Sequence, residues 1–416
     1  MSLRVAIVGA GPAGLYAAER LQKEGAEVTV IDRLPAPYGL VRYGVAADHQ
    51  STKNVERVLS RVFQKGAAFF GGVDLGRDLS MEELRGCFDA VMLATGAPSE
   101  RRLGIRGEDL PHVFGSLRIT GLMNAHPDHA AIELPRDVRE VVIVGAGNVA
   151  LDVVRVLAKV PEEFAGSDFD PALAEVIAAW PLNRIHIVAR RGAGETRFSP
   201  LELSELGKLK RARPVVDPAD IPPEDTKILN LFRGFVADQE PKPVEIVFHF
   251  NRSLRSIEPH AVVLSTGERL PADLVVTAIG QEVGDLFGQA RAGGHLANDG
   301  GRVAPGLYCV GWAKRGGTGV IGTNRNESQE VAEALLREVQ PGEKGGAACL
   351  AALLAGRGLR PWSFADWQKL DTAERAAAPA QRVRRKFWRA EELERARARS
   401  PLPRGEVERS EGEGRR

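Results

Sequence analysis

Two glycine-rich turns, each lying between an apolar strand and a helical pattern, constrain the fold of this chain most strongly. The first, Gly9–Gly14, reads GAGPAG, and the second, Gly145–Ala150, reads GAGNVA. In this context such a turn is typical of a dinucleotide-binding βαβ unit. The glycines allow a tight turn and close approach of a pyrophosphate, while the free N–H groups of the helix face the phosphates. We therefore predict two Rossmann-like units.

The residues that end these two units differ in charge. Asp32 closes the strand after the first turn, whereas Arg190 and Arg191 follow the corresponding strand of the second unit. A carboxylate at this point accepts hydrogen bonds from a free adenosine ribose, while guanidinium groups suit a ribose that carries a 2′-phosphate. This difference predicts FAD in the first unit and NADP(H) in the second. Alternatively, the two arginines are a solvated charge pair at a strand end.

The length of 416 residues is too great for one ordinary core and predicts several domains. We expect an α/β protein with two three-layer, dinucleotide-binding domains, the NADP domain being inserted into the FAD domain. Residues 1–106 and 307–398 would form the FAD domain, 107–306 the NADP domain, and 399–416 a basic, disordered tail. Smaller expectations are one helix over Ser51–Gln64 and a meander that finishes the NADP domain. The meander would consist of strands Glu245–Phe250, Ala261–Leu264 and Asp273–Ala278.

Composition excludes several other classes. The formal net charge is +1, so the chain lacks the overall field of a nucleic-acid or membrane binder. No stretch approaches the ~20 apolar residues that span a bilayer, and the apolar N-terminus leads directly into the first glycine turn. Cys87, Cys309 and Cys349 form no Cys-x-x-Cys, so we expect neither a dithiol redox centre nor a metal site. We predict three reduced, buried thiols and a cytoplasmic location.

Four further blocks of sequence occur together in this chain. They are PYGLVRYGVA at 37–46 with Asp48-His49, GNVALD at 147–152, RRG at 190–192, and a segment from Gly311-Trp312 to TGVIGTN at 318–324. Together they resemble the adrenodoxin reductase family, which are ferredoxin–NADP⁺ reductases with a glutathione-reductase-like fold. The resemblance extends to about residue 395. It implies a flavoenzyme that transfers electrons between NADPH and a small iron–sulfur protein through FAD.

The resemblance also implies which residues bind FAD. The backbone at Gly319–Ile321 would bond the pyrimidine edge of the flavin, and Leu40 would lie along the ring. Trp312 belongs to the same site, although a core aromatic is the alternative. The implied FAD contacts are Gly9, Gly11, Pro12, Ala13, Gly14, Asp32, Leu40, Val73, Gly96, Trp312, Gly319, Val320 and Ile321.

For NADP(H), the resemblance implies a second set of contacts. The set is Asn148, Val149, Ala150 and Leu151 at the pyrophosphate, Arg190 and Arg191 at the 2′-phosphate, Glu202 in the nicotinamide half, and Arg101 as a weaker phosphate or hinge contact. His49 and Glu205 match a polar pair near the flavin and nicotinamide that would steer proton exchange or cofactor orientation. A hydrogen-bonded structural role for His49 is the alternative.

The implied partner is ferredoxin or a similar acidic iron–sulfur carrier, and we expect a monomer or homodimer that binds neither nucleic acid nor membrane. Basic clusters at Lys208–Arg213, and at Lys227 and Arg233, could attract this partner, or could be solvated faces. Three other functions stay open. One is an NADPH diaphorase. Another is the electron-input subunit of a larger assembly, as in glutamate synthase small subunits, whose cysteine-rich N-terminal region does not occur in this sequence. The last is a non-catalytic FAD-binding protein.

Overall fold

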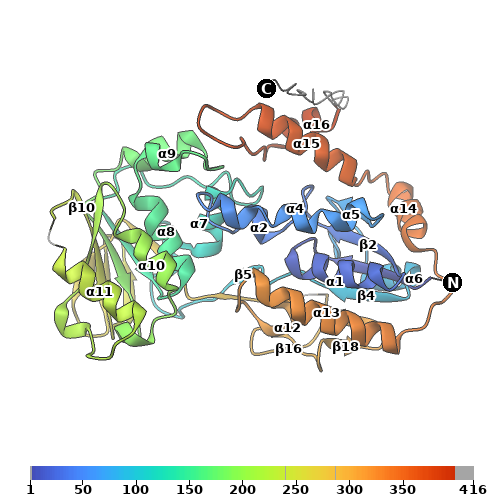
Figure 1. The fold of residues 1–416 in the computed structure, drawn as a ribbon, viewed down its shortest axis with the longest axis horizontal. Helices are drawn as coiled ribbons and strands as arrows, with labels where there is room; N and C mark the ends of the chain where they lie inside the picture. Colours follow the sequence, from blue (N-terminus) through green and yellow to red (C-terminus); the bar gives the residue numbers. More distant parts are fainter. Residues whose placement is uncertain (1, 239, 286, 399–416) are drawn as a thin grey trace, which may run out of the picture.

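Two sheets with covering layers form the two lobes seen in Figure 1; the first sheet is parallel except at one edge, and the second is parallel throughout. This computed structural model describes residues 2–238, 240–285 and 287–398, so the tail expected over 399–416 lies outside the described residues. The predicted fold class, two Rossmann-like domains in an α/β protein, is confirmed.

The sheet of the first lobe contains mostly N-terminal strands. In spatial order its strands are β18 (Arg302–Ala304), β19 (Leu307–Cys309), β4 (Ala90–Leu93), β1 (Arg4–Val8), β2 (Glu27–Asp32) and β3 (Ala68–Gly71). All neighbours are parallel except β18 and β19. Alternate residues of these apolar strands enter two different cores, because both faces are covered. Val5 and Ile7 pack toward α1 (Pro12–Lys23) and α13 (Ile321–Glu338), while Ala6 and Val8 pack toward α6 (Met81–Cys87).

The sheet of the second lobe is entirely parallel. Its spatial order is β6 (Val113–Gly115), β14 (Leu274–Thr277), β7 (Glu140–Val144), β8 (Arg184–Val188), β10 (Val244–His249) and β9 (Ala212–Val215). The helices packed against this sheet include α7 (Ser116–Met123), α8 (Asn148–Ala158), α10 (Pro200–Leu206) and α11 (Lys227–Ala237). Val141 and Ile143 face the core under these helices. Val142 and Val144 face a second core, which a small antiparallel sheet covers.

This small sheet corrects the predicted meander. Its strands are β11 (Leu254–Glu258), β12 (Ala261–Leu264) and β13 (Arg269–Pro271), which pair antiparallel. The segments Glu245–Phe250 and Asp273–Ala278 instead supply β10 and β14 to the parallel sheet, where they pair with β8 and β7. Only Ala261–Leu264 lies in the meander as expected.

The single helix predicted over Ser51–Gln64 is also wrong. The segment forms three short helices, α3 (Gln50–Lys53), α4 (Glu56–Leu59) and α5 (Arg61–Gln64). Between them the backbone makes tighter bonds over three residues, as from Arg57 N to the Asn54 carbonyl at 3.1 Å. Such bonds are the 3₁₀ type that interrupts a continuous α-helix.

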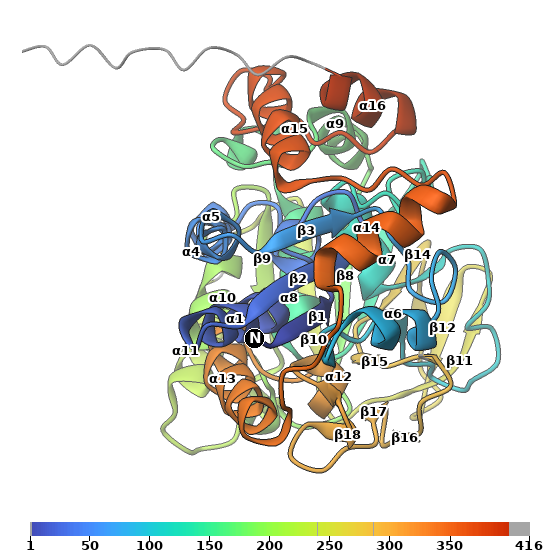
Figure 2. The ribbon, with the colours of Figure 1, turned by 90° about the vertical axis from the view of Figure 1, so that its right-hand side faces the viewer.

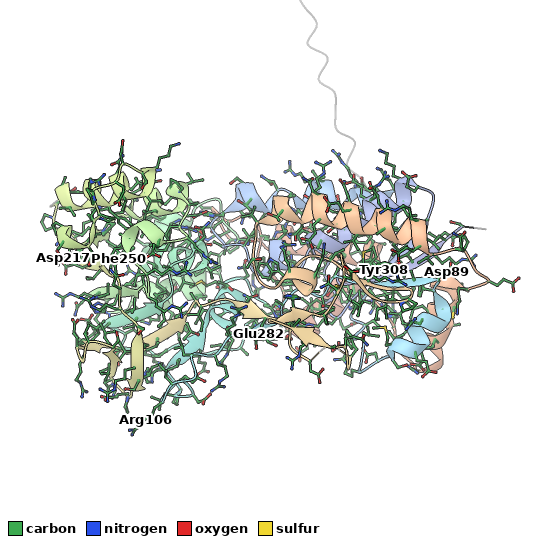
Figure 3. All side chains as sticks on the ribbon, turned by 90° about the horizontal axis from the view of Figure 1, so that it is seen from below. Asp89, Arg106, Asp217, Phe250, Glu282 and Tyr308 are labelled. Atoms are coloured by element: carbon green, nitrogen blue, oxygen red, sulfur yellow. A yellow bond between two sulfur atoms is a disulfide. The ribbon has the colours of Figure 1, made fainter. Side chains whose placement is uncertain are left out.

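The chain crosses between the lobes twice, at one place. The outward strand β5 (Ser99–Glu100) pairs antiparallel with the returning strand β15 (Gln281–Glu282). Figure 3 shows Glu282 between the two lobes. The crossings lie near residues 100 and 281, whereas we expected domain boundaries at 106 and 306. β18, which begins before residue 306, belongs to the sheet of the first lobe. Those domain limits stay predictions.

The C-terminal helices lie outside both sheets. α14 (Gly346–Gly356) packs against α6, and a disulfide between Cys87 and Cys349 joins the two helices. The prediction of three reduced thiols is therefore wrong, because the fold brings together two cysteines that are 262 residues apart; Cys309 is free and buried. Beyond α14 come α15 (Phe364–Ala376) and α16 (Ala390–Ala398), which lie at the top of Figure 2. The loop between these two helices contacts the segment before α9 (Pro171–Ala178) of the second lobe, where the Val383 N–H donates to the Ser167 carbonyl at 2.9 Å.

Within residues 2–238, 240–285 and 287–398, no helix combines the length and the apolar composition that crossing a bilayer requires.

Candidate functional site

The first glycine turn follows β1 and has room for a phosphate group. Gly9 has φ +111°, and a Cβ atom placed on it would lie 2.2 Å from the Ala94 carbonyl oxygen. A Cβ on Gly14 would lie 2.3 Å from the Gly9 oxygen, so both positions exclude larger residues. In contrast, a Cβ on Gly11 would meet no heavy atom within 4 Å. The turn is thus packed on the sheet side and open on the outer side, as a pyrophosphate cradle requires.

The N-terminus of α1 supplies donors to this open side. Pro12 has no N–H, and the Leu15 N–H already bonds the Gly11 carbonyl at 3.0 Å. The N–H groups of Ala13 and Gly14 have no acceptor within the helix, because the first turn of any helix lacks one. No side chain caps this end. These two donors and the helix dipole favour an anion at this position.

Asp32, the acid at the end of β2, lies directly beside the first turn. Its carboxylate accepts the Ala10 N–H at 2.7 Å and the Leu34 N–H at 2.9 Å. Burial raises the pKa of Asp32, although these two N–H groups favour the ionised form. Each carboxylate oxygen retains a second lone pair, which can accept a ribose hydroxyl. Val73 is buried behind this position, where its N–H bonds the Asp32 carbonyl at 3.0 Å.

The segments predicted to lie along the flavin approach the first turn closely. A Cβ on Gly39, which has φ +48°, would lie 3.0 Å from the Gly11 Cα atom. The next residue, Leu40, begins the short helix α2 (Leu40–Tyr43) and is half-buried. Gly96 follows β4 with φ +73°, and a Cβ there would meet no atom within 4 Å. The structure therefore brings Gly39, the residue before Leu40, against Gly11 and leaves open space at Gly96.

A second helix N-terminus, that of α13, carries the predicted flavin contacts Gly319, Val320 and Ile321. Gly319 has φ +83°, and the Val320 side chain is 69% exposed. The Val320 N–H bonds Thr323 Oγ1, so the N–H groups at the start of the helix, from Ile321, are left for a ligand. The indole Nε1 of Trp312 donates to the Thr318 carbonyl at 2.8 Å. Trp312 is half-buried and stabilises the loop that presents these donors.

The second glycine turn repeats the geometry of the first. Gly145 has φ +138°, and a Cβ on it would lie 2.3 Å from the Ala278 oxygen, while a Cβ on Gly147 would meet nothing within 4 Å. Asn148 and Val149 begin α8, so their N–H groups have no helical acceptor. The Asn148 Oδ1 atom accepts the Ser199 N–H at 2.7 Å, which places the start of α10 beside the start of α8.

Ala150 and Leu151 differ from this pair. Both side chains are fully buried, and both N–H groups already bond the Gly147 carbonyl, at 2.9 and 3.3 Å. Their predicted contact with the pyrophosphate therefore rests on their place in the turn rather than on a free donor.

The strand registers allow the two units to be compared position by position. Val8 pairs with Ile31 in the first unit, and Val144 pairs with Val188 in the second. Asp32 therefore corresponds to Ala189, the residue directly before Arg190. Arg190 and Arg191 are exposed, and neither guanidinium has an ion-pair partner among the described residues. The first unit thus has an acid at the end of its strand, while the second has two arginines that form no ion pair within the described residues.

Arg197 is a third cation at this turn, which the sequence reasoning missed. Its N–H donates to the Ala146 carbonyl at 2.9 Å, and its backbone bridges Gly147. The side chain is exposed and has no ion-pair partner in the described part of the chain. No local motif marks this residue, because a loop after β8 returns it to the turn.

The predicted pair His49 and Glu205 lies in contact across the two lobes. His49 Nε2 is 3.0 Å from Glu205 Oε2, and His49 Nδ1 is 3.7 Å from Glu202 Oε1. Burial, together with the nearby Asp152 carboxylate, raises the pKa of Glu202. These three side chains offer donor atoms within 4.8 Å of one another, which is close enough for a metal ion. Arg155 Nη1 already contacts both glutamates, at 2.9 and 3.2 Å, so we interpret the group as an ionic cluster.

Arg101 lies at the crossing between the lobes rather than at either glycine turn. Its N–H donates to the Gly280 carbonyl at 3.2 Å, beside β15. Its guanidinium approaches Gly294, where an added Cβ would lie 3.4 Å from the Nη2 atom. Of its two predicted roles, this position favours the hinge contact.

Comparison with known proteins gives a consistent result. Residues 3–192 match the family model described as pyridine nucleotide-disulphide oxidoreductase. The human mitochondrial NADPH:adrenodoxin oxidoreductase is 35% identical, covering 89% of this chain and 87% of its own length. Cindoxin reductase of Citrobacter braakii is 36% identical, with 92% and 88% covered. The solved structure of Mycobacterium tuberculosis FprA in complex with NADPH matches with a TM-score of 0.91 at 33% identity, covering 95% of this chain and all of that one.

Proposed function

This chain belongs to the adrenodoxin reductase-like family of ferredoxin–NADP⁺ reductases, and from that premise we propose that it transfers electrons between NADPH and a small iron–sulfur protein through FAD. Its cofactors are FAD and NADP(H). The observation that carries the proposal is the contact of His49 with Glu205. This contact joins the lobe whose glycine turn ends in Asp32 to the lobe whose turn ends in Arg190.

The protein contributes chiefly by positioning. Arg190 and Arg191 would hold the 2′-phosphate, and the N–H groups of Asn148 and Val149 would hold the pyrophosphate. The N-terminus of α13 would offer donors to the pyrimidine edge of the flavin, where such donors stabilise negative charge. When bound, FAD supplies the conversion between the electron pair of NADPH and the single electrons that an iron–sulfur cluster accepts.

Glu202, Glu205 and His49 would orient the nicotinamide half of the dinucleotide and hold a proton beside it. A hydride needs no acid or base to move, only a close and aligned donor and acceptor. We therefore assign His49 and Glu205 to orientation and proton exchange rather than to the transfer itself.

The docking surface for the iron–sulfur partner remains a proposal. The cluster Lys208–Arg213 is weaker than its sequence indicates, because Arg211 donates to backbone carbonyls of α8 and Arg213 pairs with Glu245 at 2.6 Å. Lys208 and Lys210 are exposed and can face an acidic partner. In the other cluster, Arg233 donates to the carbonyls of Pro222 and Glu224. Monomeric or homodimeric assembly and a cytoplasmic location stay predictions.

Two measurements on FAD-loaded protein test the function. Anaerobic addition of NADPH should bleach the flavin absorbance, and an unchanged spectrum would mean a non-catalytic FAD protein. Reduction of cytochrome c by NADPH should then require added ferredoxin. Equal rates with and without ferredoxin would favour a diaphorase instead.

A further inference from the structure

Arg155 is a buried arginine on α8 that contacts carboxylates from both lobes. The residue is 1% exposed. Its Nε and Nη2 atoms lie 2.9 and 3.0 Å from the two oxygens of Asp48, which makes a two-point contact. Nη2 is also 2.7 Å from Asp152, one turn earlier on the same helix, and Nη1 contacts Glu202 and Glu205 on α10. One guanidinium therefore joins four carboxylates.

The contact with Asp48 crosses the boundary between the lobes. Asp48 lies in the loop between α2 and α3 of the FAD lobe, and its side chain is 2% exposed. Lys159, at the end of α8, approaches the same carboxylate at 2.6 Å. The next residue in this loop is His49, which contacts Glu205 on α10. Two adjacent residues of one lobe are thus held by two helices of the other.

The electrostatics keep this contact ionised. Burial alone would raise the pKa of Asp48, but the hydrogen bonds and charges of Arg155 and Lys159 more than offset it, so the pKa lies well below its usual value. Burial would lower the pKa of Arg155, yet Asp48 and Asp152 raise it above its ordinary value. Paired, fork-shaped bonds between a guanidinium and a carboxylate fix orientation as well as distance.

α8 connects this contact to the nucleotide. Its first turn presents the donors of Asn148 and Val149, and Arg155 follows about two turns later on the same rigid helix. A shift of the Asp48–His49 loop against α8 therefore moves the dinucleotide relative to the flavin segments. Hydride transfer is sensitive to such shifts, since a misplacement of about 1 Å can cost about 100-fold in rate.

We propose that Arg155 is a positioning residue that sets the distance and angle between the two nucleotides, acting through Asp48, Glu202 and Glu205. The inference rests on the proposed function, since it presumes that NADPH reduces the bound flavin. A purely structural Arg155 would affect stability but not the transfer step.

The test is the rate of flavin reduction at saturating NADPH in FAD-loaded R155K. Lysine retains the charge but offers one point of contact, so it cannot form the paired bonds to Asp48 and also reach α10. We expect a rate about 10- to 100-fold lower. The apparent Kd for NADPH should change less than about threefold, because both phosphate cradles are intact. NADPH deuterated at the transferred position should show a larger isotope effect than in the unmodified protein.

Two further variants define the mechanism. Asp48→Asn should slow reduction to a similar degree, and the double variant D48N/R155K should be no slower than R155K alone, because both changes break one contact. D48N and the double variant also test the positioning role if a more drastic change such as R155M prevents folding. Arg397→Lys is the matched control, as Arg397 is a buried arginine on α16 that bonds the Arg360 and Pro361 carbonyls. It should lower stability and leave the reduction rate unchanged.

The proposal and the function can fail separately. Reduction of the unmodified protein by NADPH supports the function by itself. If R155K then reduces its flavin at the unmodified rate, the positioning role is wrong, whatever its melting temperature. A loss confined to NADPH affinity would overturn the proposal as well, because it would place Arg155 in binding rather than in alignment.

Discussion

Asp168 and Lys386 form an ion pair in which each side chain is 2% exposed, with Oδ2 and Nζ 2.9 Å apart. Asp168 belongs to the loop before α9 of the NADP lobe, while Lys386 lies between α15 and α16. Lys53 of α3 pairs with the same carboxylate at 2.8 Å, and the Asn124 side-chain oxygen accepts from both lysines. Three distant parts of the chain therefore meet at one buried carboxylate.

We expect Lys386→Met to lower the free energy of unfolding by about 2–4 kcal/mol. The change leaves the Arg42 carbonyl without its 2.9 Å partner and halves the neutralisation of Asp168, which retains Lys53. Urea unfolding measures the loss. Lys369→Met is the control, because Lys369 forms a looser, partly exposed pair with Asp366 at 3.6 Å and should cost under about 1 kcal/mol. Equal losses in both variants would contradict the structural role of the buried pair.

Acid should weaken the protein through the same carboxylate. Burial would raise the pKa of Asp168, but Lys386 and Lys53 more than offset this, so its folded-state pKa lies below its unfolded value. A lowered carboxylate pKa gives stability that is complete above the unfolded pKa of about 4 and is lost as the pH falls below it. Asp168→Asn should therefore show a shallower loss of stability from pH 5 to pH 3 than the unmodified protein, in urea titrations at each pH. Asp137→Asn, at an exposed aspartate, should retain the original slope.

Thiol counting tests the disulfide. Cys87 and Cys349 are bonded to each other, and burial raises the pKa of the Cys309 thiol to about 12. A thiol reagent that attacks the thiolate should then find no reactive group in native, unreduced protein. In denaturant we expect one thiol without reductant and three with it. Cys309→Ser should remove the single thiol, and three thiols in denaturant without reductant would show that the disulfide is absent.

The charge at the second turn predicts dinucleotide preference. Replacing Arg190 and Arg191 with alanine should lower kcat/KM for NADPH by about one to three orders of magnitude, or roughly 1.4 kcal/mol per tenfold. NADH turnover should barely change, because it has no 2′-phosphate to lose. Steady-state rates with both donors measure this. Equal losses would instead place the arginines in the fold or at the shared pyrophosphate.

Arg197→Ala separates a third arginine from that pair. Its backbone is tied to Ala146 and Gly147, so its side chain starts beside the pyrophosphate cradle. We expect kcat/KM to fall for both NADPH and NADH by a similar factor, about tenfold or less, since both donors share the pyrophosphate. A loss limited to NADPH would assign Arg197 to the 2′-phosphate, and no loss would exclude a phosphate role.

Local pattern was sufficient for the parts of the fold that depend on neighbouring residues. An apolar strand precedes each glycine turn as the sequence predicts, and Asp32 ends the strand after the first turn. The turns are predictable because sterics at Gly9 and Gly145 demand glycine. The pairing of the strands is harder to predict from the sequence. The sequence predicts strands at Glu245–Phe250 and Asp273–Ala278 but assigns them the wrong neighbours, because an apolar run does not determine which strand lies beside it.

In the candidate site, too, local motifs are predictable from the sequence, whereas contacts between distant residues are not. His49 and Glu205 were paired through a family resemblance, and the structure brings them together. Arg155 carries no signal in the sequence, where it is an ordinary helical arginine; its contact with Asp48, from the other lobe, exists only in the folded structure. Cys87 and Cys349 were likewise assigned as separate thiols, as nothing within 262 residues of intervening chain indicates their contact.

The pairing of β5 with β15 has a consequence for how this architecture can be altered. Glu100 lies opposite Gln281, so the segment between them leaves and re-enters the FAD lobe at neighbouring points. No strand of the flavin sheet comes from that segment. The NADP lobe is therefore an insertion whose two ends lie side by side. Exchanging it for a lobe with another donor preference leaves the strand order of the FAD sheet intact, but the new lobe must also supply partners for the buried side chains of Asp48 and Lys386.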